Sequence, residues 1–372
     1  MVGAGVTEEL LGAGGIRDRV DGCLEDFLVA KSRRARARGL STEIPRVLRD
    51  FLGAGGKRIR PLLCAVGWFA GGGTGPVPQA VVRVAASLEL FHAFALIHDD
   101  VMDDSDTRRG VPTVHRAQAA RRTAARGAGG TGGAGGTGSD AERFGLGAAI
   151  LAGDAALAWS DELLHTAGLP PEQLMRVLPL VDAMRTEVVH GQFADLEATG
   201  NPGGDVEAAL AVVRYKTATY TIERPLHVGA ALAGADEAVR AVLSGYALPV
   251  GEAFQLRDDL LGVFGSGERT GKSRLDDLRA GKHTVLVAQA FRYADPAQRR
   301  VLHALLGRPG LDEDDAEALR GVLLATGARD RVEDMIRERR ALALDALRAA
   351  GLPPAAAAVL RQLADTATVR PA

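Results

Sequence analysis

The sequence predicts an all-α protein, a single-domain helical bundle around a central cavity. Ala, Leu, Arg and Val are abundant, aromatic residues make up only 4% of the chain, and runs in which β-branched and polar residues alternate are few. This composition favours helices over sheets. The 372 residues, 47% of them hydrophobic, are enough to bury a large core.

Charge, cysteine usage and hydropathy exclude several classes of protein. The formal net charge of -2 and the pI of about 6.5 give no support for nucleic acid or an anionic membrane surface as a partner. Cys23 and Cys64 lack disulfide-scaffold or metal-type spacing, so a reducing, cytoplasmic location is expected. The first residues do not resemble a signal peptide, and no stretch of about 18 uncharged apolar residues predicts a membrane span.

The N-terminal part divides into a polar segment and the start of the main domain. Residues 1–40 are expected to form a polar segment with an Arg-rich surface helix over 16–40, and residues 41–366 the helical domain. An apolar segment over 45–70 is interrupted by GAGGKRIRP, and a loop follows it. The apolar spacing over 79–102 predicts a buried helix that ends in a dense acidic cluster.

The rest of the chain continues the helical pattern around one low-complexity segment. Residues 127–138, GAGGTGGAGGTG, predict a flexible loop and not a phosphate cradle, because no strand precedes them and no Lys-Ser/Thr pair follows. Together with the Arg-rich piece before it, this loop is expected to be a surface excursion between two helices. Further helices are expected over 144–167, 171–198, 205–231, 235–264, 282–304, 312–325 and 328–350.

Two acidic clusters are the strongest candidates for chemistry. The first is DDVMDD from Asp99, and the second contains Asp258 and Asp259. Asp99 and Asp103 are four residues apart and would share one face of a helix. Both clusters follow apolar helical sequence, where carboxylates near a helix C-terminus are unfavourable unless cations bind them. Clustered carboxylate oxygens suit Mg²⁺ that substrate phosphates also bind; the alternative is a solvated acidic helix end.

Basic residues accompany both clusters in an order suited to diphosphates. GGKRIRP at 55–61 presents cations on a glycine turn, and Arg108 and Arg109 follow the first cluster. Lys216 lies in a helical stretch, and Lys272 and Lys282 follow the second cluster. Arginine forks and lysine point charges together bind phosphate groups well.

With these motifs in place, the sequence resembles the trans-polyprenyl diphosphate synthase family. The matching segments run in the family's order between residues 50 and 285: GGKRIRP, His92, DDVMDDSDTRRG, GQFADL, KTATY, FQLRDDLLG and two GK pairs at 271–272 and 281–282. Within the family, TIERPLHVGAAL and DDLLGVFG are most similar to geranylgeranyl diphosphate synthases of actinobacteria.

The resemblance implies a role for each matching residue. Isopentenyl diphosphate would contact Gly56, Lys57, Arg60, His92 and Arg109. The allylic diphosphate would contact Arg108, Lys216, Gln255, Lys272 and, with a spacing that varies in the family, Lys282. The catalytic group near the allylic cation would comprise Lys216, Thr217, Gln192 and Arg108. Mg²⁺ would be bound by Asp99, Asp103 and Asp258, supported by Asp100 and Asp259. One departure is Gly262, which stands where the family's second motif often has a third aspartate.

The same resemblance implies the reaction, cofactor and partners. The chain would condense isopentenyl diphosphate with an allylic diphosphate, using three Mg²⁺ ions bound together with substrate diphosphate, and would form a homodimer. Phe91, Phe94 and Ala95 precede Asp99 on the same helix and would set product length. Ala95, four residues before Asp99, is small, and the acidic motif has no insertion, so geranylgeranyl diphosphate (C20) is the expected product.

Other functions stay open at this point. A farnesyl diphosphate synthase, or an enzyme of another product length, has the same motifs. A class I terpene cyclase is disfavoured by the GGKxxRP segment and the second aspartate pair. A non-catalytic regulatory subunit is disfavoured by the intact DDVMD. Assay with Mg²⁺ and both substrates distinguishes all of these.

Overall fold

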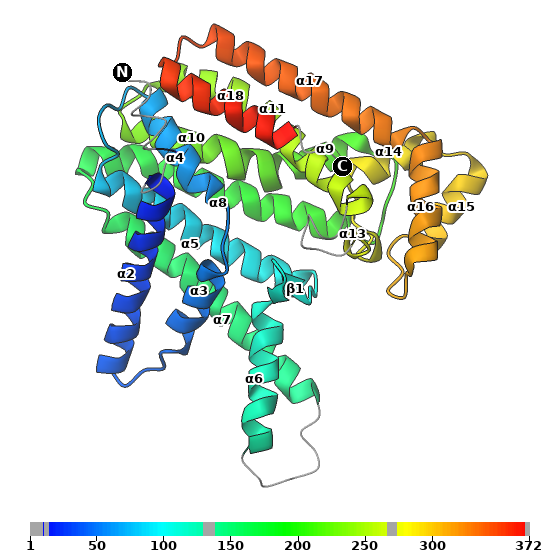
Figure 1. Cartoon of the computed structure of the whole chain (residues 1–372), viewed down its shortest axis with the longest axis horizontal. Helices are drawn as coiled ribbons and strands as arrows, with labels where there is room; N and C mark the ends of the chain where they lie inside the picture. Colours follow the sequence, from blue (N-terminus) through cyan, green and yellow to red (C-terminus); the bar gives the residue numbers. More distant parts are fainter. Residues whose placement is uncertain (1–9, 11–14, 129–137, 266–273, 369–372) are drawn as a thin grey trace. The chain divides into compact units, whose positions relative to one another are not determined.

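The protein is described here by a computed structural model, in which residues 10, 15–128, 138–265 and 274–368 are placed (Figure 1). Over these residues the chain is almost entirely helical, and the strands among them are the short pair β1 (Thr107–Arg108) and β2 (Val111–Pro112). The predicted all-α fold class is therefore confirmed. The predicted bounds of the polar segment and the main domain stay a prediction.

The described residues group into two compact units. The first unit comprises those within 1–12, 63–77 and 170–372, and the second those within 13–62 and 78–169. One of the boundaries between them falls within helix α4 (Ile59–Ala70).

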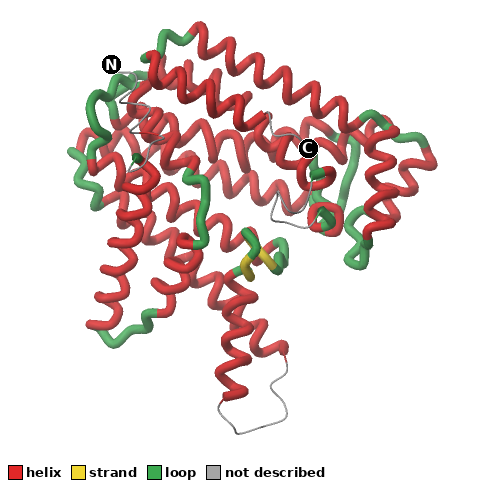
Figure 2. Tube along the Cα trace, in the orientation of Figure 1, coloured by secondary structure: helices red, strands yellow, loops and turns green. Residues whose placement is uncertain are grey.

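The second unit is built around helix α5. Its other helices are α2 (Ile16–Ala37), α3 (Glu43–Gly53), α6 (Val114–Ala128) and α7 (Gly138–His165). Helix α5 (Gln79–Met102) packs along α7 and also contacts α2, and α6 runs beside α7 (Figure 1). Buried residues lie on all sides of α5 between Val81 and Ile97, as expected for a helix in the middle of a core. The β1–β2 hairpin connects α5 to α6 (Figure 2).

Helix α5 is also the one helix of the described residues that is long and apolar enough to cross a membrane. Its most apolar 18-residue window has a mean hydropathy of 1.7, but 67% of that window is buried inside the structure. Burial of this kind is typical of the core helix of a globular domain, so the helix is weak evidence for a membrane span.

The first unit is built around helix α11 (Glu237–Phe264), which packs against α17, α18 and the π-helix η1 (Figure 1). Its other described elements are α8 (Pro171–Ala198), α9 (Val206–Val212), η1 (Val213–Glu223), α10 (Arg224–Leu232), α13 (Asp276–Arg279), α14 (Val285–Tyr293), α15 (Pro296–Leu305), α16 (Glu313–Ala325), α17 (Ala328–Ala349) and α18 (Pro354–Thr368).

The structure differs from the sequence expectation in several places. The Arg-rich piece before the glycine segment is helix α6, and a hairpin precedes it. The helix expected over 205–231 is divided into α9, η1 and α10, and α18 was not predicted. The helix expected over 282–304 is broken because Asp295 forms a capping box and Pro296 begins α15. Most of the glycine segment, residues 129–137, lies outside the described residues.

Candidate active site

The first acidic cluster lies at the C-terminal end of α5. The amide of Asp103 donates a hydrogen bond to the carbonyl of Asp99 (2.8 Å), so the two residues occupy successive turns on one helix face. Asp104 follows with φ of 49°, and the chain leaves the helix there. The predicted pairing of Asp99 and Asp103 on one face is therefore present in the backbone.

The neighbouring acidic residues have cationic partners from the hairpin and from α6. Asp100 is buried, and both of its carboxylate oxygens accept hydrogen bonds from Nε of Arg108 at 2.8 Å. Arg116 on α6 lies 2.9 Å from both Asp104 and Asp106. Arg108 is also 3.6 Å from Asp99. Asp100 thus orients Arg108 beside Asp99, whereas its predicted support of a metal ion stays a prediction.

The basic turn before α4 is fixed by a buried arginine. Arg58 has φ of 49°, and its guanidinium donates to Asp21 (2.7 Å), Glu89 (2.9 Å) and the carbonyl of Leu52 (2.8 Å). The side chains of Arg58 and Glu89 are only 6% and 4% exposed. These bonds compensate the left-handed backbone, which costs a non-glycine residue free energy. Arg58 therefore sets the path of the turn that carries Lys57 and Arg60.

Gly56 needs to be a glycine in this turn. A Cβ atom there would lie 2.9 Å from Nη1 of Arg58 and 3.2 Å from Nη2 of Arg109. Arg109, from the hairpin, donates to the carbonyl of Gly55. The absence of a side chain at position 56 therefore allows two guanidinium groups to approach the backbone closely.

His92 lies in the positive field of these residues, one turn after Glu89 on α5. Burial lowers the pKa of His92 well below its ordinary value, and the positive charges of Arg60, Arg108, Arg109 and Arg58 lower it further. The imidazole is therefore neutral at neutral pH and can donate a single ring hydrogen bond to an anion. A neutral hydrogen-bond donor surrounded by cationic side chains is an arrangement that can bind a diphosphate.

Removing Glu89 should destabilise the second unit, because Arg58 would be left buried with its charge partly uncompensated. Glu89→Ala is expected to lower the free energy of unfolding by about 3 kcal/mol. Urea denaturation followed by circular dichroism measures this. Glu43→Ala removes an exposed partner of Arg46 and Arg121 and should cost less than about 1 kcal/mol. Equal losses for the two variants would contradict the role given to the Arg58–Glu89 pair.

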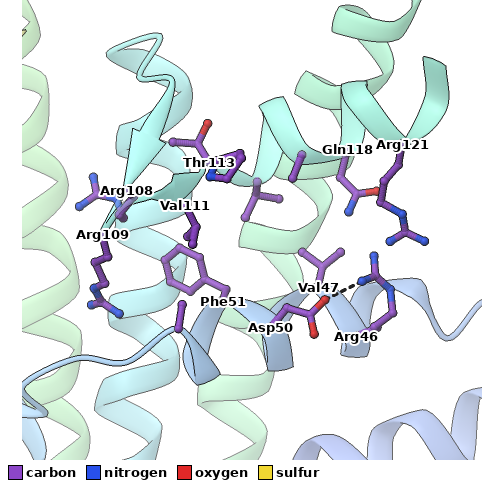
Figure 3. A pocket seen from close by; sticks show the side chains of 14 residues that line it. Arg46, Val47, Asp50, Phe51, Arg108, Arg109, Val111, Thr113, Gln118 and Arg121 are labelled. Carbon is purple, nitrogen blue, oxygen red and sulfur yellow. Dashed lines mark hydrogen bonds and ion pairs between the residues drawn. The ribbon is translucent and has the colours of Figure 1, made fainter. Parts of the chain in front are cut away.

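A pocket of about 290 Å³ lies within the second unit, between α3, the hairpin and α6 (Figure 3). Arg108 and Arg109 lie at one end of it, and Arg46, Asp50 and Arg121 at the other (Figure 3). The remaining lining is mainly apolar: Val47, Phe51, Ala54, Val111, Pro112, Thr113, Val114, Ala117 and Gln118. The two arginines predicted to bind diphosphates thus border a space near the lower end of the range for small-molecule sites.

In the first unit, Lys216 and Thr217 lie in the π-helix η1. Two glycines allow neighbouring helices to approach it closely. A Cβ atom at Gly191 of α8 would lie 2.6 Å from the amide nitrogen of Lys216, and one at Gly251 of α11 would lie 2.4 Å from Cα of Ala218. π-Helical turns are rare and occur frequently at functional sites. The segment that contains Lys216 and Thr217 is therefore a widened helix held between α8 and α11.

Polar contacts join the predicted residues of this unit. Nζ of Lys216 lies 2.6 Å from Asp195, which is three residues after Gln192 on α8. The hydroxyl of Thr217 donates to Oε1 of Gln255 (2.8 Å), and Nε2 of Gln255 donates to Asp259 (2.7 Å). The structure therefore brings three segments of the sequence into one polar group.

The two aspartates of the second cluster differ in environment. Asp258 is exposed, whereas Asp259 is buried. Burial raises the pKa of Asp259 to about 8; the hydrogen bond from Gln255 opposes this shift, and the negative charges of Asp277 and Asp258 reinforce it. Asp258 is therefore the more accessible of the two carboxylates, and the metal-binding roles expected of both residues stay predictions.

The donor atoms fit Mg²⁺ that is shared with a substrate. They are carboxylate oxygens, the hard ligands that this ion prefers. Over the described residues, no group of three His, Cys, Asp or Glu side chains gathers closely enough to hold a metal ion alone. An ion would therefore need additional oxygen ligands, and diphosphate oxygens and water can supply them. Lys272, predicted to bind the allylic diphosphate, lies outside the described residues.

Sequence reasoning missed the residues that hold the predicted ones in place. Asp195 contacts Lys216, and Glu89 and Asp21 hold Arg58. Asp195 had a local signal, since it belongs to the GQFADL segment. The acidic partners of Arg58 are 31 and 37 residues away in the chain, and no local pattern indicates such contacts.

Fold and site together define the class of protein, an all-helical prenyltransferase, and comparison with known proteins agrees. A family model described as polyprenyl synthetase matches residues 41–323. The chain belongs to the polyprenyl synthetase family.

Individual relatives differ in the product that they are named for. A geranylfarnesyl diphosphate synthase of Aeropyrum pernix is 34% identical over 287 residues, which are 76% of this chain and 80% of the relative. A (2E,6E)-farnesyl diphosphate synthase of Mycobacterium bovis is 31% identical over 312 residues, 83% of this chain and 78% of the relative. A geranylgeranyl pyrophosphate synthase of Corynebacterium glutamicum, crystallised with isoprenyl diphosphate and magnesium, is 40% identical with a TM-score of 0.89; the match covers 96% of this chain and 99% of that one.

Proposed function

We propose that this chain is a chain-elongating trans-prenyltransferase that condenses isopentenyl diphosphate with allylic diphosphates in the cytoplasm, giving geranylgeranyl diphosphate. The observation that carries the proposal is the pairing of carboxylates with phosphate-binding cations in each unit. Asp99 and Asp103 share a helix face near Arg108 in the second unit, and Lys216 contacts Asp195 in the first.

The binding of isopentenyl diphosphate is assigned to the second unit. Gly56, Lys57, Arg60, His92 and Arg109 are the proposed contacts. Arginine forks bind phosphate oxygens in bidentate fashion, and Lys57 is exposed. The neutral imidazole of His92 adds a hydrogen bond without adding charge, and so orients the diphosphate within the cationic surroundings.

The allylic substrate is assigned to Arg108, Lys216, Gln255, Lys272 and Lys282, together with the aspartates. Asp99, Asp103 and Asp258 would hold Mg²⁺, three ions in the proposal, and the bound ions would supply positive charge to the leaving diphosphate. Arg108 and Lys216 stabilise the same charge, each oriented by an aspartate that it contacts. Gln192 and Thr217 present polar atoms to the allylic cation.

Bond formation needs no nucleophilic side chain. As the allylic C–O bond breaks, the double bond of isopentenyl diphosphate supplies the electron pair for the new C–C bond, and the released diphosphate accepts the proton that is lost. The chain contributes orientation of the two substrates and exclusion of water. This accounts for a site made of cations, carboxylates and apolar walls.

The direct test incubates the pure protein with Mg²⁺, isopentenyl diphosphate and geranyl or farnesyl diphosphate, and measures product length by chromatography. A C20 product supports the full proposal. A C15 or C25 product would support the proposed reaction but contradict the proposed product length. Cyclised hydrocarbon, or no turnover with either primer, would contradict the proposal in favour of a cyclase or a regulatory subunit.

We further propose a homodimer that buries the apolar face of α7. Phe144, Leu146, Ile150 and Leu151 are exposed on this helix, Leu151 by 59%. Exposed apolar patches of this kind mark interaction surfaces.

Sedimentation velocity at micromolar concentration should show a dimer. A double variant, Ile150→Glu with Leu151→Glu, should shift it to monomer, because it places charges in an apolar interface. Met175→Glu on α8, which changes an exposed methionine, is the matched control and should stay dimeric. A wild-type monomer would contradict the proposal.

A further inference from the structure

The second aspartate motif lacks a side chain at Gly262, four residues after Asp258 and three after Asp259 on α11. On a helix, position 262 is a neighbour of both aspartates, as the i+4 position of Asp258 and the i+3 position of Asp259. The structure has another group in the space that a side chain at position 262 would enter. A Cβ atom on Gly262 would lie 2.2 Å from Oδ2 of Asp277 and 3.4 Å from its Cγ. A side chain at position 262 would therefore force the Asp277 carboxylate out of its present position.

Asp277 is held in that space by the anchoring of α13. Leu278, the next residue, is 1% exposed and belongs to the hydrophobic core of the first unit. Its carbonyl accepts a hydrogen bond from the amide of Gly307 (2.9 Å). Arg279 donates to the carbonyl of Leu311 (2.9 Å). The two residues that follow Asp277 therefore tie this short helix to the core, which gives the carboxylate a defined position.

Asp277 lies close to residues of the second aspartate motif. Its negative charge acts on Asp259, and its Oδ1 lies 3.9 Å from Nζ of Lys282, a proposed contact of the allylic diphosphate. Its carboxylate is 28% exposed, so solvent and ligands can reach it. The group therefore combines a hard oxygen donor with a neighbouring cation.

We propose that Asp277 supplies the third carboxylate of the second aspartate motif, in place of the residue missing at Gly262. Gly262 leaves space beside Asp258 because it has no side chain, and the carboxylate of Asp277 on α13 occupies that space. The inference rests on the proposed function, because it takes the Mg²⁺ bound with diphosphate as the ligand of the motif. Asp277 would accept hydrogen bonds from water on the ion or bind the ion directly.

Calorimetric titration of the full chain with Mg²⁺ in the presence of inorganic pyrophosphate tests this without turnover. Asp277→Ala is expected to weaken Mg²⁺ binding at least about tenfold. Adding Gly262→Asp to that variant should restore most of the loss, since the space that Asp277 vacates can then accept the new side chain. Asp276→Ala, which changes the exposed neighbour, should bind as the wild type does. Thermal unfolding of every variant checks that the fold is retained.

Lys282→Met separates two roles of Asp277. If Asp277 acts only by orienting Lys282, adding Asp277→Ala to the Lys282→Met variant causes no further loss of Mg²⁺ binding, and the proposal is overturned. It is also overturned if Asp277→Ala binds as the wild type does, or if the folded double variant does not regain affinity. A wild-type chain that binds no Mg²⁺ with pyrophosphate would instead contradict the proposed function itself, and this inference with it.

Discussion

Asp99→Ala is expected to lower turnover by about 10²–10³-fold, the usual cost of removing a group that stabilises charge in the transition state. The carboxylate of Asp99 lies on the same helix face as Asp103 and 3.6 Å from Arg108. Without it, charge on the departing diphosphate would be less well neutralised. Steady-state kinetics with farnesyl diphosphate as primer, at saturating Mg²⁺, measures the loss.

Asp106→Ala is the matched control for this variant. Asp106 is an aspartate of the same segment, but its exposed carboxylate contacts Arg116 on α6. It should retain nearly full turnover. A rate for Asp99→Ala above about one tenth of the wild type, a barrier increase of only ~1.4 kcal/mol, would remove Asp99 from the proposed metal site.

Ala95→Phe is expected to shorten the main product from C20 to C15. Ala95 lies one helical turn before Asp99, about 6 Å along α5 at 1.5 Å per residue. If residues of this helix set product length, as expected from the sequence, the allylic tail would extend along it away from the aspartates, and a ring at position 95 would block the tail early. Product chromatography with geranyl diphosphate as primer measures the change.

Phe94→Ala should act in the opposite direction and lengthen the product beyond C20. The ring of Phe94 packs between Phe91 (centroids 5.3 Å apart) and His98 (4.8 Å), so its removal opens a gap in an aromatic row. Leu96→Phe is the control, because it adds a ring about 100° around the helix from Ala95. If neither Ala95→Phe nor Phe94→Ala changes the product distribution, α5 does not set its length.

The helices could be predicted from the sequence because apolar periodicity and caps are local. The widened turn of η1 could not, since it depends on the close approach of α8 at Gly191 and α11 at Gly251. The β1–β2 hairpin was missed because its strands are two residues long, too short for a periodic pattern. The helix break at Pro296 could have been predicted, since Asp-Pro is a local signal for a helix start.

In the candidate site, too, local features could be predicted from the sequence and long-range contacts could not. The motif residues could be named from their order along the chain, but the contacts that orient them could not. In the sequence, Asp100 is one more acidic residue of a cluster, whereas in the structure its buried carboxylate accepts hydrogen bonds from Arg108. Asp277 lies 15 residues beyond Gly262 in the sequence, and only the folded chain brings the two together.

The burial of Asp259 has a consequence for proton linkage. Its pKa is about 8 in the folded chain and 3.8 as an unperturbed group, so between these values the folded state holds a proton that the unfolded state has lost. This group therefore makes folding less favourable as pH rises from about 4 to 8. A ligand that requires the ionised carboxylate must release that proton, and so binds more tightly as pH rises towards 8. In calorimetry, the apparent heat of such binding would change with the ionisation enthalpy of the buffer.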